Sequence, residues 1–284
     1  MTTEKVKQIL NENQITVKKH FGQNFLLDEN VLRNIINGSK IDNDTNVIEI
    51  GPGLGFLTKF LSESSKQVLC YEIDDQMVNQ IISKNYNNVN IIHDDFLNRN
   101  LDKDIEKYFN NEEVVLVANL PYYITTPILL KVLEETNKIK KMTVMMQTEV
   151  AKRICGTPST KDYNSLSVLM QYFTNPKILF NVSPKSFYPE PGVDSSVVLI
   201  EYKDINNLEY VENINYFLKF NRNIFSQRRK TLYNNIQKNY KYNKDEVLSI
   251  IEELNLSQTV RSEALSVSQI IKLANLFYLK CENK

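Results

Sequence analysis

Short runs of β-branched and other apolar residues alternate, up to residue 202, with longer segments that carry helix-like patterns. Such alternation is typical of βαβ units around a mainly parallel sheet. The runs of strand length are 47–50, 68–73, 89–92, 114–119, 142–147, 177–182 and 195–202. Because the segment between the last two runs is too short for a crossover helix, these two strands should pair antiparallel. The pattern therefore predicts an α/β fold around a mainly parallel sheet, with one antiparallel pair.

The pattern changes after Tyr202. A polar stretch, KDINNLEY, follows, and beyond it only helix-like patterns occur, such as KDEVLSIIEELN at 244–255 and SVSQIIKLANLFYLK at 266–280. We therefore expect two domains, one over residues 1–202 and a small helical one over residues 203–284.

Composition excludes several classes of protein. The 284 residues are 42% hydrophobic and 24% charged, as in ordinary soluble proteins. The sequence has no apolar run of membrane-spanning length and its start lacks the apolar core of a signal peptide, so we expect a cytoplasmic protein. Three scattered cysteines and two histidines predict neither a disulfide framework nor a metal site.

The charges of the chain balance to a formal net charge of +0, yet one segment is strongly basic. Between Glu212 and Asp245 there is no acidic residue. The eight basic residues in this segment are Lys219, Arg222, Arg228, Arg229, Lys230, Lys238, Lys241 and Lys244. A solvated helix face is the simplest interpretation of any one of them, but the whole set favours phosphate binding. The strongest candidates are Arg222, Arg228, Arg229 and Lys230.

A glycine-rich turn follows the first predicted strand, in the sequence VIEIGPGLGFLT at 47–58. Gly51, Gly53 and Gly55 let the backbone pass close beneath a ligand, where a Cβ atom would collide. Dinucleotide binding would require GxGxxG, but Phe56 breaks that spacing. The better interpretation is ExGxGxG, in which Glu49 and the glycines hold a smaller nucleoside.

Two further carboxylates follow the next two predicted strands. Glu72 lies about twenty residues beyond the glycines, where a carboxylate can accept both ribose hydroxyl hydrogens. Asp95, in HDDFL, can accept a hydrogen from an adenine amino group. Each of these signals alone is also consistent with tight packing or with solvated strand ends. Their order at three successive strand ends indicates S-adenosylmethionine.

The fourth predicted strand runs into NLPYYITTP at 119–127. Asparagine and proline often mark turns, and tyrosines often cover the rim of a core. The alternative is that Asn119, Leu120, Pro121 and Tyr122 form a rigid claw for a planar nitrogen base. For Tyr123, and for the two methionines at 145 and 146, we expect packing in the core or at its rim.

Together these motifs resemble the ribosomal RNA adenine dimethyltransferases, the KsgA (RsmA) family. The resemblance spans nearly the whole chain in the family's order. The motifs that carry it are KKHFGQNFL, EIGPGLGFLT, YEID, DDFL, NLPYYITTP, MMQTEVAKRI, SFYPEPGVDSSVV and FSQRRKTLYNN. The resemblance implies a Rossmann-like class I methyltransferase with a seven-stranded mixed sheet and a small C-terminal helical domain.

The resemblance also implies the roles of individual residues. Asn24 and Leu26 would line the methionine end of the cofactor, and its other ligands would include Gly51, Glu72, Asp95 with the adjacent Phe96, and Asn119. The Asn119 side-chain oxygen and the Leu120 carbonyl would accept the two N6 hydrogens of adenine, beside a proline that offers no competing donor. Tyr122 and Phe187 would stack on the unstacked base. His20 and His93 should be structural.

By the same resemblance, the target is two adjacent adenosines near the 3′ end of small-subunit ribosomal RNA in an immature 30S particle, and the protein acts as a monomer. A protein-glutamine methyltransferase would also place a claw after the fourth strand, but there the usual pattern is NPPY. The Erm methylases of large-subunit RNA share the fold and more often have NIPY. A third alternative is a non-catalytic ribosome assembly factor. The intact Glu72, Asp95, Asn119 and Tyr122 argue against it.

Overall fold

The computed structural model describes residues 1–18 and 22–282, so His20 lies outside the described residues. The chain forms two compact units. The first comprises Met1–Ala151 and Lys177–Glu201, and the second comprises Lys152–Pro176 and Tyr202–Lys284.

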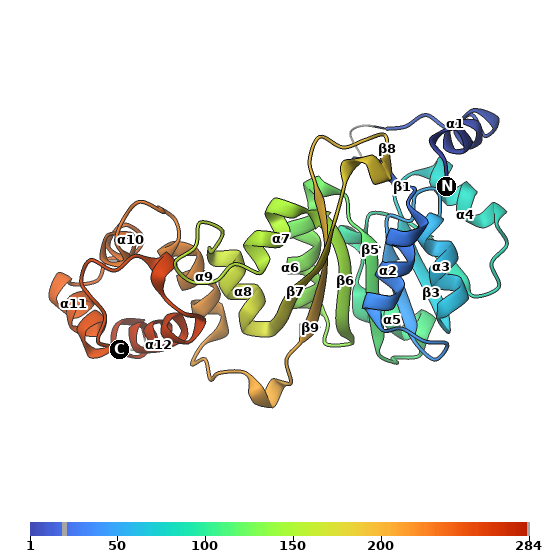
Figure 1. Ribbon diagram of the computed structural model, residues 1–284. Coiled ribbons are helices and arrows are strands. Elements are labelled where there is room, and N and C mark those ends of the chain that lie inside the picture. Colours follow the sequence, from blue (N-terminus) through green and yellow to red (C-terminus); the bar gives the residue numbers. More distant parts are fainter. Residues whose placement is uncertain (19–21, 283–284) are drawn as a thin grey trace. The chain divides into compact units, whose positions relative to one another are not determined.

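A seven-stranded sheet organises the first unit, with the strand order β4-β3-β2-β5-β6-β9-β7 (Figure 1). Its strands are β2 (Asn46–Ile50), β3 (Gln67–Glu72), β4 (Val89–His93), β5 (Val114–Asn119), β6 (Ile139–Gln147), β7 (Thr174–Val182) and β9 (Ser195–Tyr202). The pairs β2–β3, β3–β4, β2–β5 and β5–β6 are parallel, whereas β9 pairs antiparallel with β6. The predicted mixed α/β sheet is confirmed, and β7 and β9 are neighbours as expected.

Helices cover both faces of this sheet. Successive strand residues point to opposite faces. Cys70 of β3 packs with Leu57 of α3 (Phe56–Ser64) and Leu32 of α2 (Glu29–Ser39), so these two helices share one face (Figure 1). Tyr71 points to the other face, where its hydroxyl donates a 3.1 Å hydrogen bond to Asp104 of α5 (Leu101–Phe109). The helices of this part of the chain are α1 (Thr3–Glu12), α2 (Glu29–Ser39), α3 (Phe56–Ser64), α4 (Asp75–Ser83), α5 (Leu101–Phe109), α6 (Thr125–Glu135) and α7 (Thr148–Ile154).

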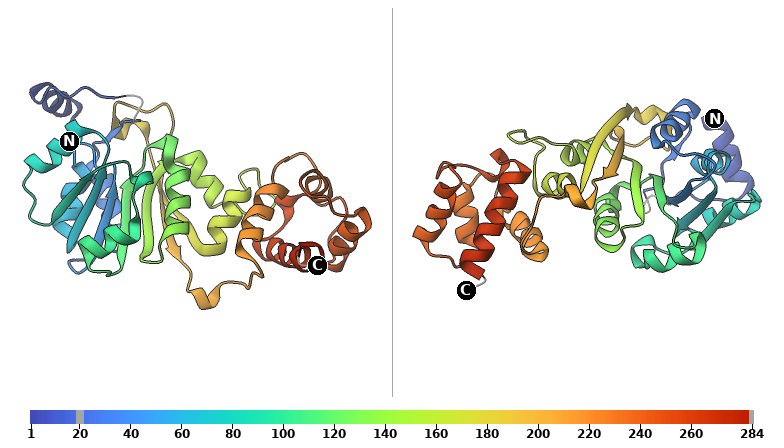
Figure 2. Two further views of the ribbon diagram at one scale, coloured as in Figure 1. Left: turned by 180° about the vertical axis from the view of Figure 1, so that it is seen from behind. Right: turned by 90° about the horizontal axis from the view of Figure 1, so that it is seen from below.

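Two features of the first unit have no signal in the hydrophobic pattern. The short strands β1 (Phe25–Leu26) and β8 (Phe187–Tyr188) pair antiparallel in a sheet of their own. Helix α1, dark blue in Figure 2, buries Val6 and Leu10 in a cluster with Leu54 and Met77. The segment before the first large strand is therefore built into the unit by pairing and by apolar contacts.

The second unit contains α8 (Ser165–Phe173), α9 (Ile214–Ile224), α10 (Leu232–Asn239), α11 (Lys244–Glu253) and α12 (Val267–Phe277), of which the last four are orange to red in Figure 2. The sequence predicted a single boundary near residue 203. The observed division lies beside it, between Glu201 and Tyr202, but residues 152–176 also belong to the second unit. The reason is apolar packing: Tyr163, Val168 and Tyr172 lie in the same buried cluster as the helices of the second unit.

Within residues 1–18 and 22–282, every helix is too short or too polar to cross a membrane.

Candidate active site

The carboxyl ends of four neighbouring strands meet at one edge of the sheet, because β4, β3, β2 and β5 are parallel and adjacent. A cavity lies at this edge, where open α/β sheets usually bind their ligands. The predicted site residues that line it are Asn24, Leu26, Glu49, Gly51, Gly53, Glu72, Asp95, Phe96, Asn119, Leu120, Pro121 and Tyr122. The structure therefore brings together residues that are up to 98 positions apart in the chain, between Asn24 and Tyr122.

The glycine-rich turn forms the floor of this cavity. Gly51 and Gly53 have φ angles of +67° and +53°, which side chains other than glycine's rarely allow. A Cβ atom on Gly53 would also lie only 3.2 Å from the ring of Phe25. Gly55 has a different role, because it does not line the cavity and a Cβ there would lie 2.5 Å from Ile81 of α4. The third glycine therefore permits helix packing.

Backbone groups hold the Glu72 carboxylate at the end of β3. The side chain is only 6% exposed. Its Oε1 accepts hydrogen bonds from the backbone of Ile73 and Asp74, both at 2.9 Å, and its Oε2 accepts one from Gly53 at 3.1 Å. Burial raises the pKa of Glu72, and these backbone donors oppose the rise. The carboxylate is thus fixed in orientation and keeps an acceptor site on Oε2 for a ligand hydroxyl.

Glu49 lies deeper, on β2, and is 2% exposed. The Cys70 thiol donates to its Oε2 at 3.5 Å. Burial raises the pKa of Glu49 to about 7, and the nearby charge of Glu72 adds to the rise. Two carboxylates of one cavity therefore differ in environment, because one is held by three backbone donors and the other is almost fully desolvated.

Asp95 and Phe96 follow β4. Asp95 accepts a 2.9 Å hydrogen bond from the backbone of Leu97, which caps the short 3₁₀ helix Phe96–Asn98. The ring of Phe96 is buried and meets the edge of Tyr71, with ring centroids 5.1 Å apart. Capping and packing together fix the position of the Asp95 carboxylate at the cavity.

The Asn119 amide is oriented by the N-terminal segment. Its Nδ2 donates to the backbone oxygen of Asn24 at 3.2 Å, so Oδ1 is the acceptor that remains for a ligand. The backbone N–H of Leu120 donates to Met145 O in β6 at 3.0 Å. Pro121 then fixes the turn, and its carbonyl accepts from Ile124 N and from the Thr125 hydroxyl. This part of the claw is rigid before any ligand binds.

Aromatic residues near the claw differ in exposure. The Tyr122 hydroxyl lies 2.7 Å from the Ser195 Oγ, which fixes the ring at the cavity wall. Phe187 does not line the cavity: it is 4% exposed and packs in the core with Leu26. Tyr123, for which the sequence suggested packing alone, lines the cavity and is 55% exposed. Pairing in the small β1–β8 sheet accounts for the burial of Phe187.

Some further residues lie as the sequence predicted, and one residue that lines the cavity was not predicted. The two methionines at 145 and 146 are buried, as expected. His93 is exposed, with Nε2 3.3 Å from the Ile73 oxygen. Gln23 also lines the cavity and was not singled out from the sequence. Its only sequence signal was its position beside Asn24 in the GQNF motif.

These residues fit S-adenosylmethionine. The glycines with positive φ at the floor of the cavity leave room for a nucleoside. Glu72 presents a fixed carboxylate that suits the vicinal hydroxyls of a ribose. The residues that would hold the cofactor are Asn24, Leu26, Glu49, Gly51, Gly53, Glu72, Asp95, Phe96 and Asn119.

The basic segment lies in the second unit, and all eight of its basic side chains are exposed. Arg228 donates from Nε to Glu263 Oε2 at 3.1 Å. The aromatic residues interleaved with these cations are mostly part of the core: Phe220 and Tyr240 are buried, and Tyr240 stacks on Tyr242 with ring centroids 4.9 Å apart. The segment therefore combines an apolar interior with a cationic surface.

Comparisons of the sequence give one consistent family. The family described as "Ribosomal RNA adenine dimethylase" matches residues 14–278. Ribosomal RNA small subunit methyltransferase A of Oceanobacillus iheyensis is 40% identical over 282 residues, which are 98% of this chain and 96% of the relative. The protein of the same name from Streptococcus sanguinis is 41% identical over 275 residues, which are 95% of this chain and 94% of the relative.

Solved structures support the same assignment. A dimethyladenosine transferase from Plasmodium falciparum is similar with a TM-score of 0.76 and 26% identity, over 90% of this chain and 98% of that one. The 23S rRNA methyltransferase ErmE shares the fold, with a TM-score of 0.67 and 22% identity over 89% of this chain and 98% of that one. The chain therefore belongs to the ribosomal RNA adenine dimethylase family of S-adenosylmethionine-dependent methyltransferases.

Proposed function

We propose that this protein transfers methyl groups to the N6 amines of two adjacent adenosines near the 3′ end of small-subunit ribosomal RNA, and so forms N6,N6-dimethyladenosine. The observation that carries the proposal is the geometry around Asn119. Its oriented amide and the Leu120 backbone lie in the same cavity as the fixed carboxylate of Glu72. Full-length relatives named ribosomal RNA small subunit methyltransferase A support the choice of RNA.

The claw would activate the amine by hydrogen bonding. The N6 lone pair of adenine is delocalised into the ring, so the amine is a weak nucleophile until its hydrogens are held out of the ring plane. Asn119 Oδ1 and the Leu120 carbonyl can accept these two hydrogens. S-adenosylmethionine supplies a methyl group already activated by its positively charged sulfur. As the new N6–CH3 bond forms, the S–CH3 bond would break, and the positively charged amine would then lose one proton to water. The contribution of this chain is therefore mostly positioning, and stabilisation of the charge that develops on N6.

Neutral Asn119 also permits a second transfer. After the first one, the amine keeps one hydrogen, which one of the two acceptors can still hold. The ring of Tyr122, fixed by Ser195, can stack on the base and offset part of the cost of unstacking it from RNA.

The second unit would hold the surrounding RNA. Its exposed cations suit a folded phosphate backbone, which proteins recognise by shape more than by sequence. The preferred substrate is then an immature 30S particle in the cytoplasm, where ribosomes assemble, and the protein acts as a monomer.

Label transfer tests this proposal. The protein is incubated with labelled S-adenosylmethionine and, in separate reactions, with immature small subunits or with protein-free large-subunit RNA. We expect label in the small subunits only. Label confined to the large-subunit RNA would assign the chain to Erm-like chemistry. Cofactor binding without label in either RNA would indicate a non-catalytic assembly factor.

A further inference from the structure

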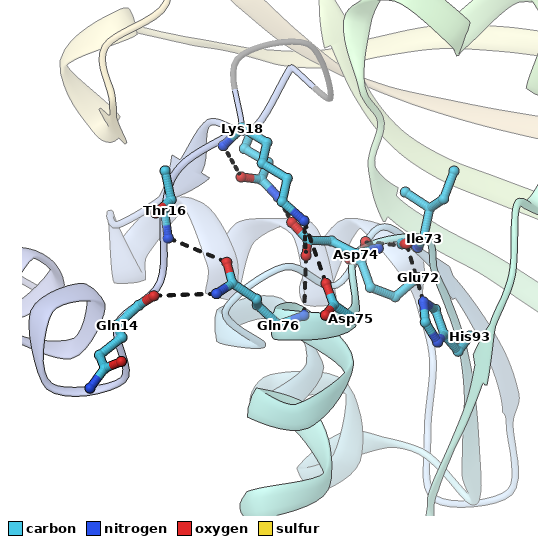
Figure 3. Close-up of polar contacts among 10 residues, drawn as sticks. Gln14, Thr16, Lys18, Glu72, Ile73, Asp74, Asp75, Gln76 and His93 are labelled. Atoms are coloured by element: carbon cyan, nitrogen blue, oxygen red, sulfur yellow. Dashed lines mark hydrogen bonds and ion pairs between the residues drawn. The ribbon is translucent and has the colours of Figure 1, made fainter.

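A second acidic residue, Asp74, lies just beyond the cofactor carboxylate. Its side chain is 0% exposed, although it carries a charge. Its Oδ1 accepts hydrogen bonds from Lys18 Nζ at 2.8 Å and from the backbone of Gln76 at 3.1 Å, and its Oδ2 accepts one from Gln23 Nε2 at 2.8 Å (Figure 3). Its own backbone N–H donates to Glu72 Oε1 at 2.9 Å. One carboxylate thus connects the N-terminal segment with the end of β3.

Capping of α4 does not explain this arrangement. An N-cap requires one acceptor atom, and the bond from Gln76 N already provides that cap. A buried charge is tolerated only where it is paired and fully hydrogen-bonded. Lys18 supplies the opposite charge, and its bond to Asp74 raises the pKa of the lysine. The lysine and Gln23 therefore bind Asp74 in addition to the cap.

Several further contacts join the same two stretches of chain. The backbone N–H of Lys18 donates to Gln23 Oε1 at 2.8 Å, which links the two partners of Asp74 to each other. Figure 3 also shows Gln76 bonded to the backbone of Thr16 and of Gln14, at 3.3 and 3.2 Å. The N-terminal segment is thus held at several points against the start of α4.

The position of Gln23 connects these contacts to the cavity. Gln23 and Asn24 are consecutive and both line the cavity. Asn24 is joined on its other side to Asn119 at the end of β5, through its backbone oxygen. Because β2 lies between β3 and β5, Gln23 and Asn24 connect the strand ends on both sides of the glycine-rich turn. Release of Gln23 from Asp74 would therefore remove the link to the end of β3 and leave Asn24 held by Asn119 and by its own bond to the Gly22 oxygen, while Glu72 stays in place.

We propose that Asp74 is a positioning residue for the methionine end of the cofactor. It holds Gln23, and through it Asn24, by its bonds to Gln23 and Lys18, without touching the cofactor itself. The inference rests on the proposed function, in which Asn24 faces the methionine moiety and Glu72 binds the ribose. The cofactor's two ends then depend on different atoms of Asp74: the methionine end on its carboxylate, and the ribose end on its backbone N–H.

Two ligands distinguish binding at the methionine end of the site from binding at the ribose end. S-adenosylmethionine carries the amino and carboxylate groups of methionine, whereas 5′-deoxy-5′-methylthioadenosine has the same ribose and adenine without them. Asp74→Asn keeps an N-capping side chain and the backbone N–H to Glu72. It removes the charge that pairs with Lys18. One acceptor oxygen then remains for three donors, which are Lys18 Nζ, Gln23 Nε2 and the backbone N–H of Gln76. Calorimetry of both ligands on the full chain then measures each end separately.

For Asp74→Asn we expect about tenfold weaker binding of S-adenosylmethionine, because the loss of a hydrogen bond to a charged group typically has an effect of this size. The affinity for methylthioadenosine should change by less than about twofold. Lys18→Met should show the same selectivity, and the double variant should bind about as weakly as Asp74→Asn alone, because both changes remove the same Lys18–Asp74 ion pair. Asp44→Asn is the matched control. Its carboxylate is exposed and lies outside these contacts, so both affinities should stay within about twofold.

The outcomes are distinguishable. If the unchanged protein binds neither ligand, the proposed cofactor site fails. If it binds both, and folded Asp74→Asn weakens them equally or not at all, the positioning role is overturned while the cofactor site stands. Should Asp74→Asn not fold, Lys18→Met decides on the same criterion, since the lysine side chain is 29% exposed.

Discussion

The cavity of the first unit and the basic segment of the second use charge in opposite ways. In the cavity, the carboxylates of Glu49 and Glu72 are buried, and each has specific hydrogen-bond partners. In the basic segment, eight cations are exposed, and Arg228 has an ion pair with Glu263. The first arrangement suits the selection of a small ligand by geometry. The second suits electrostatic attraction of a polyanion, which acts over about a Debye length and weakens with salt.

This difference predicts how the two regions respond to mutation. Removal of one buried group changes a single contact with defined geometry, so the effect should be large and specific to one step. Removal of one exposed cation changes a sum of weak attractions, so the effect should be small, additive and dependent on salt.

The largest effect is expected at the claw. Asn119→Ala should still bind cofactor and RNA but lose about a hundredfold or more in transfer rate, as when one preorganised transition-state contact is removed. Single-turnover kinetics with saturating RNA measure this loss. The control is Asn43→Ala, at an exposed asparagine. Transfer at the parental rate by Asn119→Ala would contradict the role of the claw.

The next effect concerns pH and Glu49. Burial raises its pKa to about 7 from an ordinary 4.5, so between these values the folded protein binds this proton more strongly than the unfolded chain. Glu49 therefore favours folding below about pH 5, and this contribution is lost as pH rises through 7.

Glu49→Gln removes that titration. Between pH 5 and 8, the free energy of unfolding of the parent should fall by roughly 2 kcal/mol more than that of the variant. Urea denaturation at each pH measures both, with the exposed Glu63→Gln as the control. Parallel pH profiles for parent and Glu49→Gln would show that the buried carboxyl does not titrate in this range.

A smaller effect is expected for cofactor affinity at Glu72. In the proposed site Glu72 accepts from the ribose hydroxyls, so Glu72→Ala should weaken S-adenosylmethionine binding by about tenfold or more, or about 1.4 kcal/mol. Calorimetry measures the change, and exposed Glu113→Ala is the control. Unchanged affinity in a folded Glu72→Ala protein would remove this residue from the site.

The smallest effect per residue is expected in the basic segment. Replacement of Arg228, Arg229 and Lys230 by Gln should weaken RNA binding and reduce the slope of its salt dependence by about 2, as expected for some three phosphate contacts. Cofactor affinity should hardly change. The control replaces three exposed lysines of the first unit, Lys103, Lys107 and Lys140, by Gln. Equal slopes for the parent and the first variant would mean that the segment is only a solvated surface.

Local patterns predicted most of the fold. Strand β5 begins and ends at the predicted residues, and β9 does too, because runs such as VVLVAN have a strong apolar and β-branched signal. The pairing of β1 with β8 and the place of residues 152–176 in the second unit were not predicted. Both depend on contacts between segments far apart in the chain, which periodicity does not record.

In the candidate site, too, local patterns predicted some residues, whereas contacts between distant segments were not predicted. Glu72, Asp95 and Asn119 were predicted from their positions at strand ends, since parallel strands bring these ends to one edge. The bonds of Asp74 to Lys18 and Gln23 span more than 50 residues and have no local signature. Phe187 and Tyr123 illustrate a further limit, because the motif positions of the two rings do not determine which one faces the cavity.

The most direct test of the central claim is to identify the modified nucleosides. Immature small subunits are methylated by the protein, their RNA is cut into defined fragments, and each fragment is analysed by mass spectrometry. The account predicts N6,N6-dimethyladenosine at two adjacent positions in the fragment nearest the 3′ end. Methylation of any other base, or of adenosines elsewhere in the RNA, would contradict it.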